Sequence, residues 1–346
     1  MIAKLATGEL ASGDQWFGGQ TKNPWDPTQG SSGSSAGPSS ATAAGCVAFG
    51  IGTETSGSIL SPAARCGLAG LRPTFGRISR YGVMALSWTQ DRLGPLCRYA
   101  EDCAIVMRAI ARPDGRDMSV TDVPFNWNAQ LDVKALKVGY IKESFDELTN
   151  AAAKKNAAAA LDTLRSIGVS TFVPIAVPEM AMNLGGLGVE STVFFDEHAR
   201  AGRMKEARGG GRPNGRLIPA VEYLQSQRVR MMMMTALAEA TAHVDVYIVA
   251  SNNNGMGGPG GRGGGRGSAP PVEPPRPQTP AQRHSTLANL ACYPAINVPN
   301  GFSETGSPTN MTIFAQPYRE MEILALAKAF QDAAGFHLAR PTRLDS

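Results

Sequence analysis

The chain has 346 residues, of which 42% are hydrophobic, and a formal net charge of +4. This length and apolar content suffice to bury a large core, whereas the charge is too small to indicate a nucleic-acid-binding protein. No apolar run is long enough to cross a membrane and no signal peptide begins at Met1, so we expect a cytoplasmic protein. The five cysteines have no C-x-x-C spacing and indicate neither a disulfide framework nor a zinc site.

The first half of the chain alternates between predicted helices and strands. We expect a small-residue helix at 41–50 with Pro38 near its first turn, a strand and turn at 77–84, and a helix at 100–111. A strand at 136–141, an Ala-rich helix at 150–167 that ends at Gly168, and a strand at 170–174 follow. This strand–helix–strand order is typical of a mostly parallel sheet.

The second half adds two helices and one strand. We expect a long helix at 219–241, a buried strand at 244–249, and a C-terminal helix at 319–334 that stops at Gly335. The methionine run Met231–Met234 is typical of adaptable packing. Residues 252–280 are rich in glycine and then in proline, a composition that cannot build a core, so we expect a disordered loop there.

The segment from Gly30 to Thr74 is the most informative part of the sequence. Its glycines and small residues surround two serine clusters, Ser34–Ser35 and Ser56–Ser58. Gly/Ser-rich runs are usually flexible linkers, but apolar residues recur here at Val47, Phe49, Ile51, Ile59, Leu60, Leu68 and Leu71. We expect these apolar residues to be buried, which a linker would not need, so the rhythm predicts a folded, tightly turned backbone that presents hydroxyl groups.

Three motifs in this segment resemble the signature of the amidase signature family, whose members hydrolyse amides with a Ser–cis-Ser–Lys triad. They are Gly33-Ser34-Ser35-Ala36-Gly37-Pro38, Gly52-Thr53-Glu54-Thr55-Ser56-Gly57-Ser58-Ile59 and Cys66-Gly67-Leu68-Ala69-Gly70-Leu71-Arg72-Pro73-Thr74. Further matches extend the resemblance over most of the chain. It implies an α/β fold with a mixed central β-sheet flanked by helices, in a single domain over residues 1–346. It also implies a small-molecule amide substrate, no cofactor and no metal, and a homodimer is compatible with it.

By this resemblance, Ser58 is the nucleophile that becomes acylated and Ser34 is the serine that relays its proton. The Gly33–Ser34 peptide bond is expected to be cis. A serine hydroxyl needs a base to take its proton, and the tetrahedral intermediate needs preorganised donors for its oxyanion. We expect these donors to be the backbone N–H groups of Thr55, Ser56 and Gly57, with Gly57 permitting the tight turn.

A second interpretation of the same residues makes Ser35 the nucleophile. Gly33-Ser34-Ser35-Ala36-Gly37 matches the G-x-S-x-G elbow of the α/β-hydrolases. Such an elbow follows a buried strand, yet the preceding residues contain Pro24 and Pro27, which a central strand does not tolerate. None of the four histidines, His198, His243, His284 and His337, lies in a context that marks it as a triad base. The elbow is therefore the weaker hypothesis.

The third triad member is not found among these residues. In the family the catalytic lysine lies upstream of the serine motif, farther than this chain extends, so we expect that an N-terminal part of the fold is absent. Lys4 resembles a later family segment and Lys22 lies in a turn; a repositioned Lys4 is the minor alternative. Because acid–base groups contribute roughly 10²–10⁴-fold to the rate, we predict weak or no amidase activity for the chain by itself.

Two functions therefore stay open. The first is an amidase that acts through Ser58 and Ser34, and the second is a non-catalytic remnant or binding protein that keeps the fold. The family's GTDTGGSIR element has Glu54 for the aspartate, Ser56 for a glycine and Leu60 for the arginine here. These departures argue against glutamine as the substrate.

Overall fold

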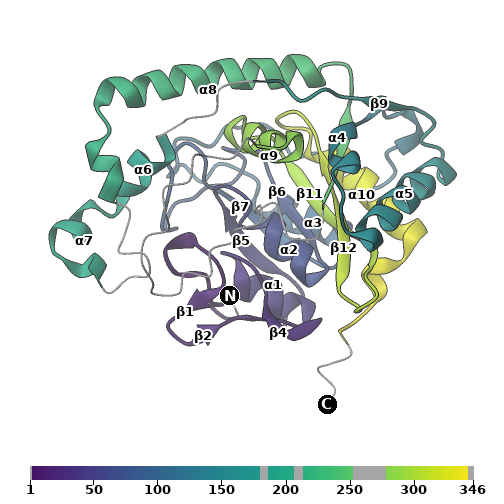
Figure 1. Cartoon of the computed structure of the whole chain (residues 1–346), viewed down its shortest axis with the longest axis horizontal. Helices are drawn as coiled ribbons and strands as arrows, with labels where there is room; N and C mark the ends of the chain where they lie inside the picture. Colours follow the sequence, from purple (N-terminus) through teal and green to yellow (C-terminus); the bar gives the residue numbers. More distant parts are fainter. Residues whose placement is uncertain (1, 180–185, 206–212, 252–277, 342–346) are drawn as a thin grey trace.

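The computed structural model describes residues 2–179, 186–205, 213–251 and 278–341, and an eight-stranded sheet lies at its centre (Figure 1). In order across this sheet, the strands are β5 (Gly50–Glu54), β7 (Arg92–Cys97), β6 (Ala69–Arg72), β11 (Ala295–Phe302), β12 (Pro308–Phe314), β10 (Val246–Ala250), β8 (Val138–Tyr140) and β9 (Phe172–Pro174). One sheet thus joins strands from the signature segment to strands near the C-terminus.

The sheet is mixed. From β5 to β10 each neighbouring pair is antiparallel, whereas β10, β8 and β9 run parallel to one another. The predicted strand–helix–strand unit is confirmed as the parallel pair β8 and β9, but the mostly parallel arrangement holds only at this end. The rest of the sheet is antiparallel. It includes the hairpin of β11 and β12, two consecutive strands that need only a short turn between them.

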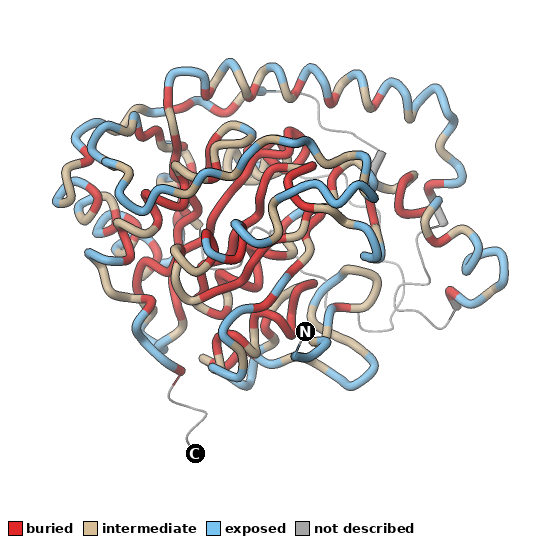
Figure 2. Tube along the Cα trace, turned by 180° about the vertical axis from the view of Figure 1, so that it is seen from behind, coloured by how far each residue is buried: buried red, intermediate tan, exposed pale blue. Residues whose placement is uncertain are grey.

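Helices cover both faces of the sheet. They are α1 (Ala36–Ala43), α2 (Leu60–Cys66), α3 (Ala100–Ile110), α4 (Lys142–Asp146), α5 (Ala151–Ser166), α6 (Gly186–Phe194), α7 (Asp196–Arg200), α8 (Ala220–Thr241), α9 (Pro280–Leu290) and α10 (Glu320–Ala334). Buried residues of α3, α5 and α10 form one core, and buried residues of α2, α8 and α9 belong to a second. Figure 2 shows the buried residues concentrated around the central sheet.

Alternation along the strands assigns side chains to these two cores. Ile313 of β12 belongs to the core with α3, α5 and α10, whereas the next residue, Phe314, belongs to the core with α2, α8 and α9. Because successive side chains of a strand point to opposite faces, one strand contributes to both cores. A third, smaller cluster beneath the signature segment consists of Ala43, Ile59, Ala63, Cys66, Leu68 and Leu96.

Most predicted helices are confirmed within one or two residues, namely those at 100–111, 150–167, 219–241 and 319–334. The predicted stops at Gly168 and Gly335 are also confirmed, since both have a φ in the left-handed region, at 100° and 72°. The methionine run is only partly packed: Met233 is fully buried, whereas Met231 and Met232 are exposed.

Two local predictions are wrong. The helix expected at 41–50 spans Ala36–Ala43 instead, because the chain turns at Gly45, where φ is 81°, and enters β5 at Gly50. Residues 77–84 form turns and no strand. There the Arg80 side chain donates to Asp117 and to the carbonyl of Trp88, which holds the segment as a loop.

The predicted disordered loop at 252–280 falls mostly outside the described residues. Its last two residues are ordered, since Thr279 caps α9 in a capping box with Gln282 and Pro280 is the first residue of that helix. Within the described ranges, no helix combines the length and the apolar character needed to cross a membrane.

The first thirty residues form two small hairpins outside the central sheet. β1 (Gln15–Trp16) pairs with β2 (Gly19–Gln20), and β3 (Lys22–Asn23) pairs with β4 (Asp26–Gly30). The proline-containing stretch before the serine motif is therefore a peripheral strand, β4. As expected, no central strand leads into Ser34 and Ser35.

Candidate active site

The fold brings the two serines of the signature segment together. Ser34 lies just before α1, and Ser58 lies two residues before α2. The backbone N–H of Ser35 donates to the carbonyl oxygen of Ser58 at 3.1 Å, which ties the two turns to each other. The Gly33–Ser34 peptide bond is cis, as expected. Ser34 is buried, whereas Ser58 is partly exposed.

The loop from Glu54 to Leu60, called here the Ser58 loop, is closed by a carboxylate. Oε2 of Glu54 accepts the backbone N–H of Ile59 at 2.7 Å and of Leu60 at 3.0 Å. At the tip of the loop Gly57 has a φ of 105°, a value that residues with a Cβ rarely adopt. Glu54 therefore joins the end of β5 to the start of α2 and fixes the turn that carries Ser58.

Glu54 in turn belongs to a buried polar cluster. Its Oε1 lies 3.0 Å from Nη1 of Arg72, and both side chains are fully buried. Arg72 also donates to Oδ1 of Asn289 at 2.5 Å and, through Nε and Nη2, to the carbonyl of Tyr293. Burial acts to raise the pKa of Glu54, but the charges of Arg72 and Arg92 and the two N–H donors outweigh it and lower that pKa. Glu54 is thus held as a carboxylate.

Two further residues hold Thr55, the first predicted oxyanion residue. Its Oγ1 donates to Oδ1 of Asp91 at 2.6 Å, and its carbonyl accepts from Nη2 of Arg92 at 2.8 Å. Arg92 is buried, and its Nε and Nη1 have no partner among the described residues. Burial, together with the charge of Arg72, lowers the pKa of Arg92 to about 10. A positive charge therefore lies directly behind the Ser58 loop.

Two backbone donors near the tip of the loop, the N–H groups of Ser56 and Gly57, are free. Among the described residues, no acceptor lies within hydrogen-bond distance of the N–H groups of Ser56 and Gly57. Ser56 is exposed and Gly57 is buried. Free N–H groups on a loop fixed at both ends are what an oxyanion site requires.

Ser35 is not available as a nucleophile. It is fully buried, and its Oγ donates to the carbonyl of Thr53 and accepts from the N–H of Thr53, both at 3.0 Å. β5 is an edge strand of the sheet, and this hydroxyl bonds to the N–H and carbonyl groups of Thr53 on the edge of β5 that no neighbouring strand pairs with. The geometry rules against the elbow hypothesis.

The lysines before the signature do not reach the serines. Lys4 is exposed, and Nζ of Lys22 donates to Oε1 of Gln20 at 3.2 Å. In the part of the chain that the structure describes, no lysine donates to Ser34 or Ser58. The N-terminal stretch meets the site through its backbone instead, since the N–H of Gly8 donates to the carbonyl of Ser34 at 2.9 Å.

One departure from the family's pattern and one burial prediction can be checked in the structure. The Leu60 side chain is buried in the core with Tyr247 and Phe314, so the position that holds an arginine in the family's pattern is apolar here. The predicted burial of Phe49 and Ile51 is wrong, since they are 47% and 38% exposed. The other apolar residues after Ser58 are buried, namely Ile59, Leu60, Leu68 and Leu71.

Sequence reasoning did not assign roles to the side chains that hold the Ser58 loop. These are Glu54, Arg72, Asp91, Arg92 and Asn289. A usable signal was present, because Arg72 and Arg92 are charged residues next to apolar ones in strand-like runs. Such charges in a buried strand require partners.

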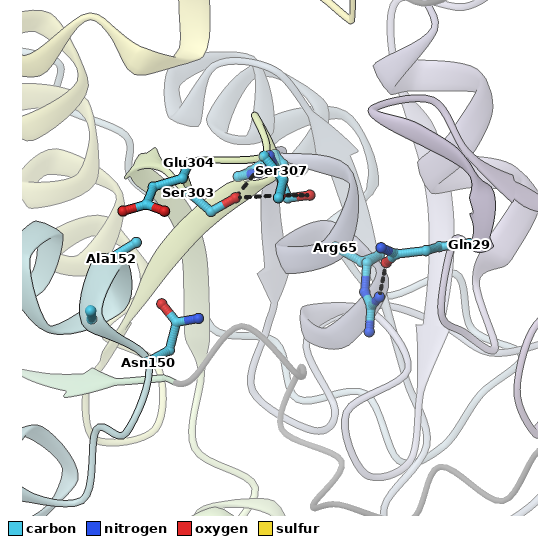
Figure 3. A pocket seen from close by; sticks show the side chains of 10 residues that line it. Gln29, Arg65, Asn150, Ala152, Ser303, Glu304 and Ser307 are labelled. Atoms are coloured by element: carbon cyan, nitrogen blue, oxygen red, sulfur yellow. Dashed lines mark hydrogen bonds between the residues drawn. The ribbon is translucent and has the colours of Figure 1, made fainter.

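A surface pocket lies at the far end of α2 from Ser58 (Figure 3). Gln29, Arg65, Asn150, Ser303, Glu304 and Ser307 line it, and Arg65 donates to Gln29 at 2.7 Å. None of the residues of the Ser58 loop contributes to it. The described residues contain no group of three or more His, Cys, Asp or Glu side chains that could hold a metal ion.

Comparisons with known proteins show which family the chain resembles over most of its length. A family model described as Amidase matches residues 7–324. The A-subunit of the glutamyl-tRNA(Gln) amidotransferase from Chromohalobacter salexigens is 31% identical over 367 residues, which cover 96% of this chain and 72% of that protein.

Solved structures show the same fold. The A-subunit of the glutamyl-tRNA(Gln) amidotransferase from Thermotoga maritima superposes with a TM-score of 0.74 at 23% identity, over 96% of this chain and 73% of that one. A bacterial aryl acylamidase that belongs to the amidase signature enzymes superposes with a TM-score of 0.70 at 19% identity, over 96% of this chain and 71% of that one.

Proposed function

This chain belongs to the amidase signature family, and from that membership we propose that it cleaves carbon–nitrogen amide bonds through an acyl-enzyme on Ser58. The observation that carries the proposal is the link between the Ser34 turn and a rigidly held Ser58 loop whose Ser56 and Gly57 N–H groups are free. We also propose that residues 1–346 form one domain, because strands from residues 50 to 314 share one sheet.

The proposed reaction has two stages. Ser58 Oγ forms a bond to the amide carbonyl carbon as its proton passes to Ser34, and Ser34 passes its own hydroxyl proton on to the amide nitrogen. The oxyanion is held by the N–H groups of Thr55, Ser56 and Gly57. Collapse of this intermediate breaks the carbon–nitrogen bond, and the amine leaves with the relayed proton. Water then attacks the acyl group on Ser58, which releases the acid and restores the serine.

The Arg92 side chain supports this step from behind the loop. Its guanidinium donates to the carbonyl of Thr55, and that carbonyl belongs to the same peptide unit as the N–H of Ser56. A hydrogen bond at one end of a peptide unit polarises the other end and strengthens it as a donor. Arg92 therefore favours negative charge at the proposed oxyanion position.

Covalent labelling tests the proposal directly. A fluorophosphonate probe is expected to modify Ser58 in the full chain, and Ser58→Ala is expected to abolish the adduct. Ser56→Ala removes an exposed hydroxyl two residues away and serves as the matched control, which should label like the parent chain. An adduct on another serine, or none at all, would reject Ser58 as an activated nucleophile.

A second candidate is a binding protein that keeps the amidase fold. One observation favours it: no lysine of the described part donates to Ser34 or Ser58, so the proton of Ser58 has no side-chain base there. Turnover of a generic aryl amide separates the two functions. We expect slow turnover that is lost in Ser58→Ala, and turnover equal in both proteins would favour the binding function.

Glutamine is not the substrate that we propose. The relatives named above include part of an amidotransferase, but the buried Leu60 offers no charge to a substrate carboxylate. We expect a neutral primary aryl carboxamide to be preferred over glutamine as a substrate, and parallel assays of ammonia release from each check this.

A further inference from the structure

The loop from Leu86 to Asp91, called here the 86–91 loop, connects the Ser58 loop to two helices. On its inner side, Oδ2 of Asp91 accepts the N–H groups of Leu86 and Ser87 at 2.5 and 2.9 Å. Oδ1 of the same carboxylate accepts the hydroxyl of Thr55 at 2.6 Å. A shift of the 86–91 loop therefore moves the group that anchors Thr55.

A buried glutamate of α6 holds the outer side of this loop. Glu190 accepts the hydroxyl of Ser87 and the hydroxyl of Thr89, the latter at 2.8 Å, and the N–H of Thr89 at 3.3 Å. Tyr223 of α8 donates to the same carboxylate at 3.3 Å. Glu190 is only 4% exposed, so its charge is shielded from water and depends on these donors.

A buried arginine of α8 holds the loop from a second direction. Arg230 donates through Nη1 to the hydroxyl of Thr89 at 2.7 Å and through Nη2 to the carbonyl of Thr89 at 2.9 Å. Its Nε donates to the carbonyl of Leu290 at the end of α9, at 2.9 Å. This guanidinium is therefore shared between the 86–91 loop and α9.

The Thr89 hydroxyl bridges the two opposite charges. It donates to Glu190 and accepts from Arg230, and no direct ion pair joins these two side chains in the described structure. Two buried charges thus meet through one hydroxyl group on the loop. Because each charge would lose a partner if the loop moved, the arrangement resists displacement of Thr89.

We propose that Glu190 and Arg230 are positioning residues that fix the Ser58 loop through Thr89, Asp91 and Thr55. The catalytic part of this inference rests on the proposed function of Ser58, but the mechanical part does not. In this proposal α6 and α8 do more than pack against the core. Through Thr89, Asp91 and Thr55 they set the geometry of the proposed oxyanion donors, which they do not contact directly in the described structure.

Amide hydrogen exchange in the full chain tests the mechanical part. Thr89→Val keeps the shape of the residue and removes the bridging hydroxyl. The reporter amides in the Ser58 loop and at the start of α2 are those of Ile59, Leu60 and Ser61, which are hydrogen-bonded to Glu54 and Gly57. We expect their exchange to become about tenfold faster, as loss of a hydrogen bond to a charged group allows.

Two variants serve as controls. Thr89→Ser restores the hydroxyl and should restore slow exchange, which a packing defect alone would not predict. Thr163→Val makes the same change on α5, where the hydroxyl only bonds to the carbonyl of Ala159. It should leave Ile59, Leu60 and Ser61 unchanged. Should Thr89→Val fail to fold, Glu190→Gln removes the charge and keeps the shape, and the same acceleration is expected.

Two results would overturn the proposal. One is faster exchange at Ser87–Asp91 with unchanged exchange at Ile59–Ser61, and the other is no rescue by Thr89→Ser. The rate of fluorophosphonate labelling of Ser58, expected to fall about tenfold in Thr89→Val, tests the catalytic part. If the parent chain is not labelled, the proposed function fails, while the exchange result still decides on the positioning residues.

Discussion

The Ser58 loop and the stretch from Leu5 to Gly8 both lie against the serine pair, but they are built differently. Buried charges hold the Ser58 loop, with Glu54, Arg72, Asp91 and Arg92 contributing from different strands and turns. The N-terminal stretch contacts the site through backbone hydrogen bonds, from Gly8 to Ser34 and from Gly37 to Ala6.

This difference separates two parts of the proposed chemistry. Side chains that β5, β6 and β7 carry into the core hold the loop that contains Ser58, the proposed nucleophile, and the proposed oxyanion donors. Among the described residues, the N-terminal stretch reaches Ser34 through a backbone group, the N–H of Gly8, and no lysine donates to Ser34. In the proposed reaction, electrostatic stabilisation and proton transfer therefore depend on different regions of the chain.

The largest effect is expected from Glu54→Gln. This change leaves Arg72 without its buried counter-charge, and removal of one partner of a buried pair costs about 3–5 kcal/mol. Urea unfolding measures the loss. The matched control is Asp162→Asn, which breaks the exposed pair with Arg165 and should change stability little. A loss below about 1 kcal/mol for Glu54→Gln would mean that the buried charges do not hold the Ser58 loop.

The second prediction concerns His284, whose pKa the charge of Arg72 helps to lower. His284 is fully buried, and burial together with the charge of Arg72 lowers its pKa from 6.5 to about 3. The unfolded chain therefore binds more protons than the folded chain between these values, so this term removes stability as the pH falls below about 6.5. Between pH 7 and pH 4.5 the expected loss is on the order of 2–3 kcal/mol.

The variant His284→Gln isolates this term, because all other titrating groups remain. Its free energy of unfolding should fall less steeply than that of the parent chain between pH 7 and pH 4.5. Parallel curves for the two proteins would show that His284 is not held neutral in the folded state.

The third prediction concerns the N-terminal stretch. A Cβ on Gly8 would lie 1.9 Å from the carbonyl oxygen of Gly13, so Gly8→Ala must displace backbone. We expect a loss of about 1–3 kcal/mol in the free energy of unfolding. Gly188→Ala in α6 is the control, because a Cβ there meets nothing within 4 Å and alanine favours a helix. Equal effects of the two changes would show that the backbone crossing at Gly8 is loose.

How much of this site could be predicted depends on the range of each interaction. Resemblance to the amidase signature singled out Ser34, Ser58 and the cis peptide, because the motif that carries the resemblance is contiguous. Local patterns did not reveal the side chains that hold the Ser58 loop. Arg72, for example, bonds to Asn289, which lies 217 residues away in the sequence, and no local pattern encodes that contact.

The fold predictions that failed did so for a similar reason, whereas those that rest on local periodicity were confirmed. The helix at 100–111 follows from apolar periodicity and was confirmed. The expected burial of Ile51 in β5, and of Phe49 just before that strand, was wrong, because whether β5 lies inside the sheet or at its edge is decided by pairing with strands far along the chain. Periodicity identifies a strand, but it does not place that strand in a sheet.

The smallest effect is expected from Arg92→Met, which tests the charge behind the Ser58 loop without removing the loop itself. Arg92 forms no ion pair among the described residues and donates to a single acceptor, the Thr55 carbonyl, so its replacement should cost only about 1 kcal/mol of stability. The Thr55 carbonyl loses its charged donor, so the Ser56 N–H becomes a weaker donor and labelling of Ser58 by a fluorophosphonate should slow by about tenfold. Arg65→Met, at the far end of α2, should label at the parent rate. An unchanged rate for Arg92→Met would mean that the Ser58 loop owes its donors to geometry alone.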